Sequence, residues 1–128
     1  MSPIRAAGRN RGTRPRQTIS ACLIVLNEEQ LLPEALASVD FCDEIVVVDS
    51  GSTDATVEIA RKASATVIEN LWRGFGAQRN LAIDKARGDW ILELDADERV
   101  TPELKRSLED FLASPEGAEF EIAAMLWQ

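Results

Sequence analysis

Residues 19–50 read ISACLIVLNEEQLLPEALASVDFCDEIVVVDS, and this stretch decides the fold class of the 128-residue chain. The run at 19–26 is almost continuously apolar, which is typical of a strand buried on both faces of a sheet. Apolar residues then recur at helical spacing over 28–39, where Pro33 is tolerated because it falls in the first turns. A second buried strand, EIVVV, follows at 44–48. This order predicts a parallel strand pair joined by a right-handed helical crossover.

The same alternation continues toward the end of the chain. The expected helices cover 55–62, 75–86 and a segment that begins at Pro102, and the expected strands cover 65–69, 90–94 and 120–126. Ser52 or Thr53 is expected to cap the first of these helices, and Thr101 the last. Gly88 is expected to close the middle one just beyond its end. The predicted fold class is α/β, with a doubly wound, mostly parallel sheet and helices on both faces.

Charge is distributed unevenly along the chain. Residues 1–17 hold five of the 14 basic residues and none of the 22 acidic ones, which all lie in 18–128. The first segment, rich in Arg, Gly, Pro and Asn, is predicted to be a disordered tail. Its charge suits contact with anionic lipid headgroups, and a solvated tail without a function is the alternative. The acidic body argues against nucleic-acid binding, which would need a basic stripe on the folded part.

Composition excludes several other functions. Histidine is absent, which excludes Cys–His nucleophilic catalysis and His-rich zinc sites. Cys22 and Cys42 are best explained as reduced, buried thiols of a cytosolic protein. No apolar stretch approaches the roughly 20 residues of a membrane span, and the Arg-rich start lacks the apolar core of a signal peptide. We therefore predict a cytoplasmic protein that is at most peripheral at the cytoplasmic face of the membrane.

Polar, mostly acidic clusters follow three of the predicted strands, namely LNEE at 26–29, DSGSTD at 49–54 and DADE at 95–98. Ligands of open parallel sheets bind where the carboxyl ends of the strands meet, so the clusters are expected to converge on one site. Asp95 and Asp97 offer two carboxylates in one turn, enough to hold Mg²⁺ or Mn²⁺ with positions left open for a diphosphate. A cap or turn role explains Asp49 and Asp95 poorly, because each ends a buried strand, where a charge needs a partner.

Spacing argues against other ligand sites. A calcium loop counted from Asp95 needs Gly at its sixth position and Glu at its twelfth, where Val100 and Arg106 stand. The segment GFGAQR at 74–79 half-resembles a dinucleotide fingerprint. However, Arg79 replaces its third glycine, and the segment follows the third predicted strand, not the first. The phosphate-binding loop GxxxxGK[ST] does not occur.

The three clusters, in this order, resemble the family-2 glycosyltransferases with the GT-A fold. The resemblance is carried by ISACLIVLNEE at 19–29, EIVVVDSGSTDAT at 44–56 and GFGAQRNLAIDKARGDWILELDADE at 74–98. It covers about 18–113, most of the chain. The run ENLWRGFGAQRNLAI at 69–83 is similar to the subgroup that adds sugars to the lipopolysaccharide core of Gram-negative bacteria.

The resemblance implies that a sugar moves, with inversion, from a nucleoside-diphosphate sugar such as a UDP-sugar to a saccharide or lipid-linked acceptor. The pathway would be the synthesis of lipopolysaccharide or another cell-envelope polysaccharide. Seven residues would face the donor: Asn27 and Glu28 beside the nucleoside, Asp49 against the uracil or ribose, Asp54 beneath the base, Arg79 on the nucleotide, Asp95 at the ribose or metal, and Asp97 as principal metal ligand. The alternatives are an acidic helix N-terminus for Asp54 and, for Arg79, a structural ion pair with one of these acids.

The chain departs from the family beyond the predicted strand that ends at the DADE cluster. Whole members place the acceptor-side base in that later part, and here Glu116, Glu119 and Glu121 lie in no recognisable motif, so no base is assigned. We expect an incomplete domain over 18–128 that binds nucleotide without transferring sugar. The alternatives are a non-catalytic nucleotide-binding fragment or a sugar-phosphate nucleotidyltransferase. The latter would need a Gly-rich, basic loop at 27–30, which reads NEEQ.

Overall fold

The computed structural model describes residues 4–6 and 17–113. Its strands are β1 (Ile4–Ala6), β2 (Ile19–Val25), β3 (Glu44–Asp49), β4 (Thr66–Glu69) and β5 (Trp90–Glu93), and its helices are α1 (Leu32–Ser38), α2 (Thr56–Lys62), α3 (Phe75–Lys85) and α4 (Pro102–Ala113). The strands form one sheet in the order β1-β5-β2-β3-β4. Only the β1–β5 pair in this sheet is antiparallel. The predicted α/β class with a mostly parallel sheet is confirmed.

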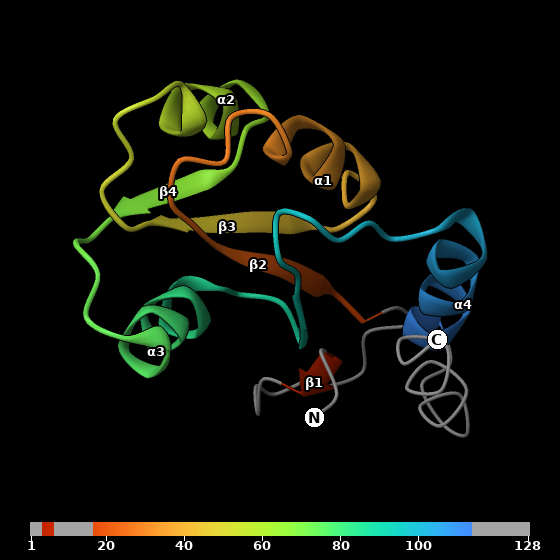
Figure 1. Ribbon diagram of the computed structural model, residues 1–128. Coiled ribbons are helices and arrows are strands. Elements are labelled where there is room, and N and C mark those ends of the chain that lie inside the picture. The colour runs from red at the N-terminus through yellow and green to blue at the C-terminus, as the bar shows by residue number, and fades with distance from the viewer. Residues whose placement is uncertain (1–3, 7–16, 114–128) are drawn as a thin grey trace.

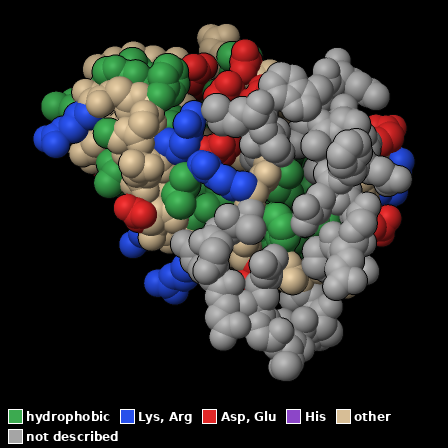
Figure 2. All heavy atoms as spheres, turned by 90° about the horizontal axis from the view of Figure 1, so that it is seen from below, with side chains coloured by type: hydrophobic (Ala, Val, Ile, Leu, Met, Phe, Trp, Pro, Cys, Tyr) green, Lys and Arg blue, Asp and Glu red, His purple; other side chains and the backbone are tan. Residues whose placement is uncertain are grey.

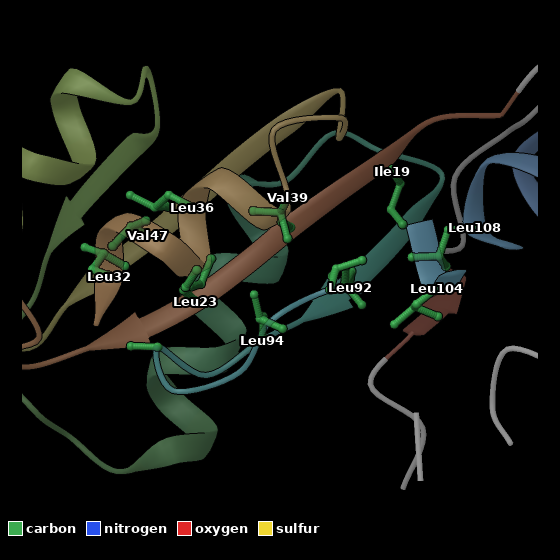
Figure 3. Packing of buried hydrophobic residues seen from close by; sticks show 14 of the residues in the cluster. Ile19, Leu23, Leu32, Leu36, Val39, Val47, Leu92, Leu94, Leu104 and Leu108 are labelled. Atoms are coloured by element: carbon green, nitrogen blue, oxygen red, sulfur yellow. The ribbon is translucent and has the colours of Figure 1, made fainter. Parts of the chain in front are cut away.

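Helices cover both faces of the sheet, which explains the nearly continuous apolar runs in its central strands. Figure 1 shows α1 and α2 on one face and α3 on the other. In β2, Ile19, Ala21, Leu23 and Val25 belong to the larger core, which also contains residues of α1, α2 and α4. Cys22 of the same strand belongs to the second core, with Ala82 and Ala86 from α3 and its C-cap. Figure 3 shows the larger core from close by.

Strand β1 lies in the segment that the sequence predicted to be disordered. Its three residues pair with β5, with Ile4 opposite Leu92 and Ala6 opposite Trp90. An ion pair supports this pairing, because Arg5 Nη2 lies 2.7 Å from Glu93 Oε1. The prediction of a disordered tail is therefore wrong for residues 4–6 and for Gln17, whose N donates to Leu112 O at 2.9 Å, and for 1–3 and 7–16 it lies outside the described residues. The predicted strand at 120–126 and the late glutamates also lie outside them.

The helix ends confirm one predicted cap and correct another. Thr101 Oγ1 accepts a hydrogen bond from Leu104 N at 3.1 Å, as expected of the α4 cap. Neither Ser52 nor Thr53 caps α2, which has Ala55 at its N-cap position with no side-chain cap. Instead, Asp54 Oδ1 accepts a hydrogen bond from the backbone N of Thr56 at 2.9 Å. The prediction was wrong because Ser52 lies three residues before the N-cap position and donates its hydroxyl to Asp49 Oδ1.

Gly88 has a different role from the predicted helix terminator. Its φ angle is not in the left-handed region. A Cβ at this position would lie 2.6 Å from Ser20 Oγ and 2.7 Å from Ser20 N, so the chain passes directly against β2. Glycine is needed here for close approach, not to close a helix. In the described part of the chain no helix is long and apolar enough to cross a membrane.

Candidate functional site

The three polar clusters lie on loops at one edge of the sheet. Strand β2 pairs in parallel with β3 on one side and with β5 on the other, so the loops that follow these three strands leave the sheet at the same edge. The β2–α1 loop contains Asn27 and Glu28, the β3–α2 loop contains Asp54, and the β5–α4 loop contains Asp95 and Asp97. The predicted convergence of the clusters therefore occurs in the structure (Figure 1).

Asn27 joins the first two of these loops by a reciprocal pair of hydrogen bonds. Its backbone N donates to Ser52 Oγ at 2.8 Å, and its side-chain Oδ1 accepts from Thr53 N at 2.8 Å. Asn27 has a φ of 52°, a left-handed conformation that asparagine tolerates better than most residues. Its side-chain oxygen is therefore engaged in holding the loops together. The exposed surface of Asn27 remains available to a ligand.

A second set of contacts joins the same two loops next to Asn27. Glu28 N donates to Thr56 Oγ1 at 2.8 Å, and Glu29 Oε2 accepts from Ala55 N at 3.1 Å. The α1 helix begins at Leu32 and not at the predicted residue 28, after a turn in which Leu31 N and Leu32 N donate to Glu28 O. The half-buried Glu28 side chain makes no hydrogen bond or ion pair within the described residues. It remains free to face a ligand.

Asp54 is held in the same network. The hydroxyl of buried Thr56 donates a short hydrogen bond to Asp54 Oδ1, and this bond is the main cause that holds the pKa of Asp54 below its ordinary value. Desolvation raises the pKa by less than this bond lowers it, and the backbone N–H groups of Thr56 and Glu29 each make a smaller further contribution that lowers the pKa. The alternative role of Asp54, as an acid at a helix N-terminus, is what these contacts show.

Asp49 is almost fully buried, and its partners lie in its own loop. Its Oδ2 accepts hydrogen bonds from Gly51 N at 3.1 Å and Ser52 N at 2.9 Å, while Oδ1 accepts one from Ser52 Oγ at 2.5 Å. The expectation that a turn role explains Asp49 poorly was therefore wrong. The carboxylate is satisfied by the turn that it shapes, and Gly51 provides the φ of 113° that the turn requires.

Asp95 and Asp97 differ from Asp49 in that both are exposed. Within the described residues neither carboxylate is in a hydrogen bond or an ion pair. The loop backbone around them is nevertheless fixed. Asp95 N donates to Glu98 Oε1 at 2.8 Å, and Asp95 O accepts from Glu98 N at 2.9 Å. The loop thus presents two hard oxygen ligands two residues apart, the chemistry that Mg²⁺ and Mn²⁺ prefer.

Arg99 fastens this loop to its neighbour. Its Nη1 donates to Ala96 O and Glu98 O, each at 2.6 Å, and its Nη2 donates to Leu31 O at 2.9 Å. No group of three or more potential metal ligands occurs within 4–6 and 17–113. A cation on Asp95 and Asp97 would therefore take further oxygen ligands from a bound molecule or from water.

Arg79, predicted to reach the nucleotide, is paired with an acid outside the predicted set. Its Nε lies 2.9 Å from Oε1 of Glu93, the last residue of β5. Arg5 contacts the same oxygen, so one glutamate joins β1, β5 and α3. Figure 2, seen from the side of α3, shows Lys and Arg side chains next to Asp and Glu side chains on this face. The alternative role as an ion-pair partner is thus present, although with an acid that was not considered.

Gln78 is a structural residue of the site that the sequence reasoning missed. Its buried Nε2 donates to Ser50 Oγ at 3.1 Å and to Asn70 O at 2.8 Å, and its Oε1 accepts from Asn70 Nδ2 at 2.7 Å. The first turn of α3 is in this way bound to the ends of β3 and β4. The available signal was a glutamine within the quoted motif, next to Arg79.

An exposed apolar patch borders the site, formed by Leu71, Trp72 and Phe75, which are 74%, 49% and 64% exposed. The two rings meet edge to face with their centroids 4.8 Å apart. The patch adjoins the Asp49 loop, because a Cβ on Gly51 would lie 3.0 Å from Leu71 Cδ2. Such exposed patches mark sites of contact with ligands or partners.

The chain is similar to a known family and to several curated proteins. The family model described as Glycosyl transferase family 2 matches residues 20–118. The chain is 46% identical over 106 residues to a TPR repeat-containing protein of Synechococcus elongatus, covering 81% of this chain and 26% of that protein. It is 41% identical over 99 residues to an uncharacterized glycosyltransferase of Rickettsia conorii, covering 77% and 35%. It is 35% identical over 105 residues to the lipopolysaccharide core biosynthesis glycosyltransferase LpsC of Rhizobium meliloti, covering 78% and 39%.

Solved structures agree with these relationships. The fold is similar to mannosyl-3-phosphoglycerate synthase from Rubrobacter xylanophilus, with a TM-score of 0.64 and 27% identity over 77% of this chain and 38% of that one. It is also similar to glucosyl-3-phosphoglycerate synthase from Mycobacterium tuberculosis in complex with Mn²⁺, uridine diphosphate and glucosyl-3-phosphoglycerate. There the TM-score is 0.59 and the identity 29%, over 79% of this chain and 41% of the other. The chain spans between a quarter and two fifths of the curated relatives named above.

Proposed function

Because the chain belongs to glycosyltransferase family 2, we propose that it binds the nucleoside-diphosphate sugar, a UDP-sugar, at the carboxyl edge of its sheet. The observation that carries this proposal is the contrast within the site. Asp95 and Asp97 present carboxylates that have no partner among the described residues, on a fixed loop beside two loops that are already bound to each other. A rigid cradle with two open oxygen ligands suits a diphosphate that arrives with a divalent cation.

The proposed donor contacts follow from this arrangement. Asp97, with Asp95, would hold Mg²⁺ or Mn²⁺, and when bound the ion supplies Lewis-acid stabilisation of the charge that develops on the leaving diphosphate. Glu28 and the exposed surface of Asn27 would border the nucleoside. Asp49 and Asp54 would shape the loop beneath the base, Asp49 by holding the backbone of Gly51 and Ser52.

The acceptor is proposed from similarity alone. The likeness to LpsC, a lipopolysaccharide core biosynthesis glycosyltransferase, supports a saccharide or lipid-linked acceptor of the cell envelope. Inversion in one step needs a base at the acceptor hydroxyl, and no carboxylate is assigned to that role. We further propose a cytoplasmic location, with the basic residues of 1–17 other than Arg5, which pairs with Glu93, in contact with anionic headgroups of the membrane.

A different function is sugar-phosphate nucleotidyl transfer. That reaction would call for a Gly-rich, basic loop after β2 to cradle a triphosphate. The loop contains Asn27, Glu28 and Glu29 instead, and its backbone N–H groups at these positions donate to side chains of the neighbouring loop. They are therefore not available to phosphates, which favours the glycosyltransferase proposal.

The proposal is tested by titrating the chain with UDP in a calorimeter, once with excess Mn²⁺ and once with excess chelator. We expect binding in Mn²⁺ and little or none in chelator, because the carboxylates of Asp95 and Asp97 repel a diphosphate unless a cation lies between them. Titration with uridine is the matched control, since a nucleoside without phosphates should bind equally in both buffers. Equal UDP affinity with and without metal would refute the proposal.

Adding a labelled UDP-sugar and a core-oligosaccharide acceptor then distinguishes transfer from binding alone. The sequence predicts nucleotide binding without sugar transfer by this chain, and slow hydrolysis as the only turnover. A non-catalytic nucleotide-binding module would bind UDP and show no turnover at all. Transfer at a rate normal for an enzyme would show that an acceptor base lies within the 128 residues.

A further inference from the structure

Glu93 occupies a central position between three elements. It is the last residue of β5 and stands two residues before Asp95. Its Oε1 accepts from Arg5 Nη2 of β1 at 2.7 Å and lies 2.9 Å from Arg79 Nε of α3. The Glu93 side chain is 19% exposed, and those of Arg5 and Arg79 are 41% and 36% exposed. The glutamate is thus the inner member of this group, and the arginines are its outer members.

The contact with Glu93 uses only one of the three guanidinium nitrogens of Arg79. Within the described residues, Nη1 and Nη2 make no hydrogen bond or ion pair. A guanidinium that is held through Nε presents its two terminal nitrogens as a fork that matches two oxygens of a phosphate. Arg99 differs, because its Nη atoms are bound to carbonyl oxygens of its own and the neighbouring loop.

Arg79 lies between the ends of β3 and β4, where α3 is bound, and the strand that leads to Asp95. Arg79 follows Gln78, whose side chain is bound to Ser50 and Asn70 after β3 and β4. From there the Arg79 side chain reaches the end of β5, two residues before Asp95. Glu93 is in register with Cys22 of β2, the strand that lies between β3 and β5 in the sheet.

We infer that Glu93 is a positioning residue that holds Arg79 through Nε, so that the free guanidinium nitrogens bind the diphosphate of the nucleotide. This inference rests on the proposed function and adds a residue that does not itself touch the donor. An exposed arginine loses side-chain entropy when it binds a ligand, and an anchor that fixes it beforehand reduces that cost. Glu93 supplies the anchor from the strand that leads to Asp95 and Asp97.

Arg5 completes this arrangement. A Glu93–Arg79 pair alone has no net charge, whereas the group of Arg5, Glu93 and Arg79 has a net charge of +1 at neutral pH. A positive group at an otherwise acidic edge favours an anion. Among the residues that the structure describes, Arg5 Nε is buried without a hydrogen-bond partner, so its placement has an energetic cost that the pairing with Glu93 offsets.

The inference is tested by a double-mutant cycle on the full chain, with UDP and Mn²⁺ as the probe. We expect Arg79→Gln and Glu93→Gln each to weaken UDP binding about tenfold, the loss expected for one charge-assisted hydrogen bond. The double variant should bind UDP as weakly as Arg79→Gln alone, because Glu93 acts through Arg79. Uridine binding should stay the same in all variants. Glu109→Gln, an exposed acid on α4, is the matched control.

A second variant tests whether charge alone is sufficient. Arg79→Lys keeps the positive charge and can still pair with Glu93, but it cannot present a fork while doing so. It should lose about as much UDP affinity as Arg79→Gln, and thermal melts should show that both variants are folded.

Four outcomes would overturn the inference. Losses that add in the double variant, or that are equal for uridine, would show that Glu93 acts on the fold or on the Asp95 loop and not through Arg79. Unchanged UDP affinity in Glu93→Gln would overturn it while leaving the proposed function in place. Absence of UDP binding to the wild-type chain would overturn the proposed function, and this inference with it.

Discussion

The two edges of the sheet both contain clusters of acids, yet they use them differently. At the amino edge, Asp89 Oδ2 accepts from Thr18 N at 2.9 Å and Thr18 Oγ1 at 3.0 Å, and Asp43 Oδ2 accepts from Ile19 N at 2.8 Å. At the carboxyl edge, Asp95 and Asp97 make no such contact within the described residues. The acids named at the amino edge have partners within the fold, whereas Asp95 and Asp97 have none among the described residues, which is why we propose the carboxyl edge as the ligand site.

The carboxyl edge is itself divided. The loops after β2 and β3 are bound together by Asn27 and Thr56, and the acids Asp49 and Asp54 belong to that structure. The backbone of the loop after β5 is also fixed by hydrogen bonds, but the carboxylates of Asp95 and Asp97 have no partner among the described residues. Substitutions at the different acids should therefore separate binding from stability.

Asp97→Asn should have the largest effect and should act on binding alone. We expect UDP affinity in Mn²⁺ to fall at least about 100-fold, since outer partners of metal ligands alone can cost that much. The melting temperature should not change, because the exposed side chain has no partner in the described fold. Calorimetry and thermal melts measure the two quantities, with Glu109→Gln as control. A large loss of stability would place Asp97 among the structural acids.

Asp49→Ala should affect both binding and stability. It leaves the N–H groups of Gly51 and Ser52 without their acceptor, so we expect the free energy of unfolding to fall by about 1–3 kcal/mol. UDP binding should weaken over the same range, with or without metal, because the loop beneath the nucleoside loses its shape. Denaturant unfolding and calorimetry test this together. If binding is unchanged, Asp49 is a turn residue only.

Asp89→Ala should affect stability and not binding, which makes it the amino-edge counterpart of Asp97→Asn. Thr18 loses the acceptor of both its N–H and its hydroxyl, so the free energy of unfolding should fall by about 1–3 kcal/mol. The UDP affinity of the folded protein should equal that of wild type. A weaker affinity measured well below the melting temperature would contradict the separation of the two edges.

Asp54→Asn should have the smallest effect, and one that depends on pH. The Thr56 hydroxyl lowers the pKa of folded Asp54, so the ionised form stabilises the fold above the unfolded pKa of about 3.9. That stabilisation is lost as the pH falls through the lowered folded pKa. The difference in unfolding free energy between wild type and Asp54→Asn should therefore be constant near neutral pH and shrink below about pH 4. A difference that does not vary with pH would refute this origin.

Sequence reasoning predicted the sheet and the three loops because both depend on local patterns. Strands buried on both faces must be apolar throughout, and acids directly after them are visible in the sequence. The same patterns could not show which acids are used by the fold and which are available to a ligand. Asp49 and Asp95 each follow a buried strand, and only the structure shows that Asp49 finds its partners two and three residues away.

Features that depend on distant residues were beyond the reach of the sequence. Arg5 and Glu93 are 88 positions apart, and nothing in an arginine-rich segment indicates that three of its residues form a strand. The pairing of Arg79 with Glu93 was missed for the same reason. Gly88 was assigned to a helix end because its contact, Ser20, lies 68 positions earlier.

The pairing of β1 with β5 has a consequence for how the protein folds. During synthesis the first strand of the chain has no partner until Leu92 and its neighbours have left the ribosome, whereas β2, β3 and β4 pair in the order in which they are made. Contacts between distant residues carry the largest loop-closure cost, and a strand of three residues contributes few hydrogen bonds to offset it. Strand β1 should therefore join the sheet last and leave it first, and amide protons at this border should exchange with solvent before those at the centre of the sheet.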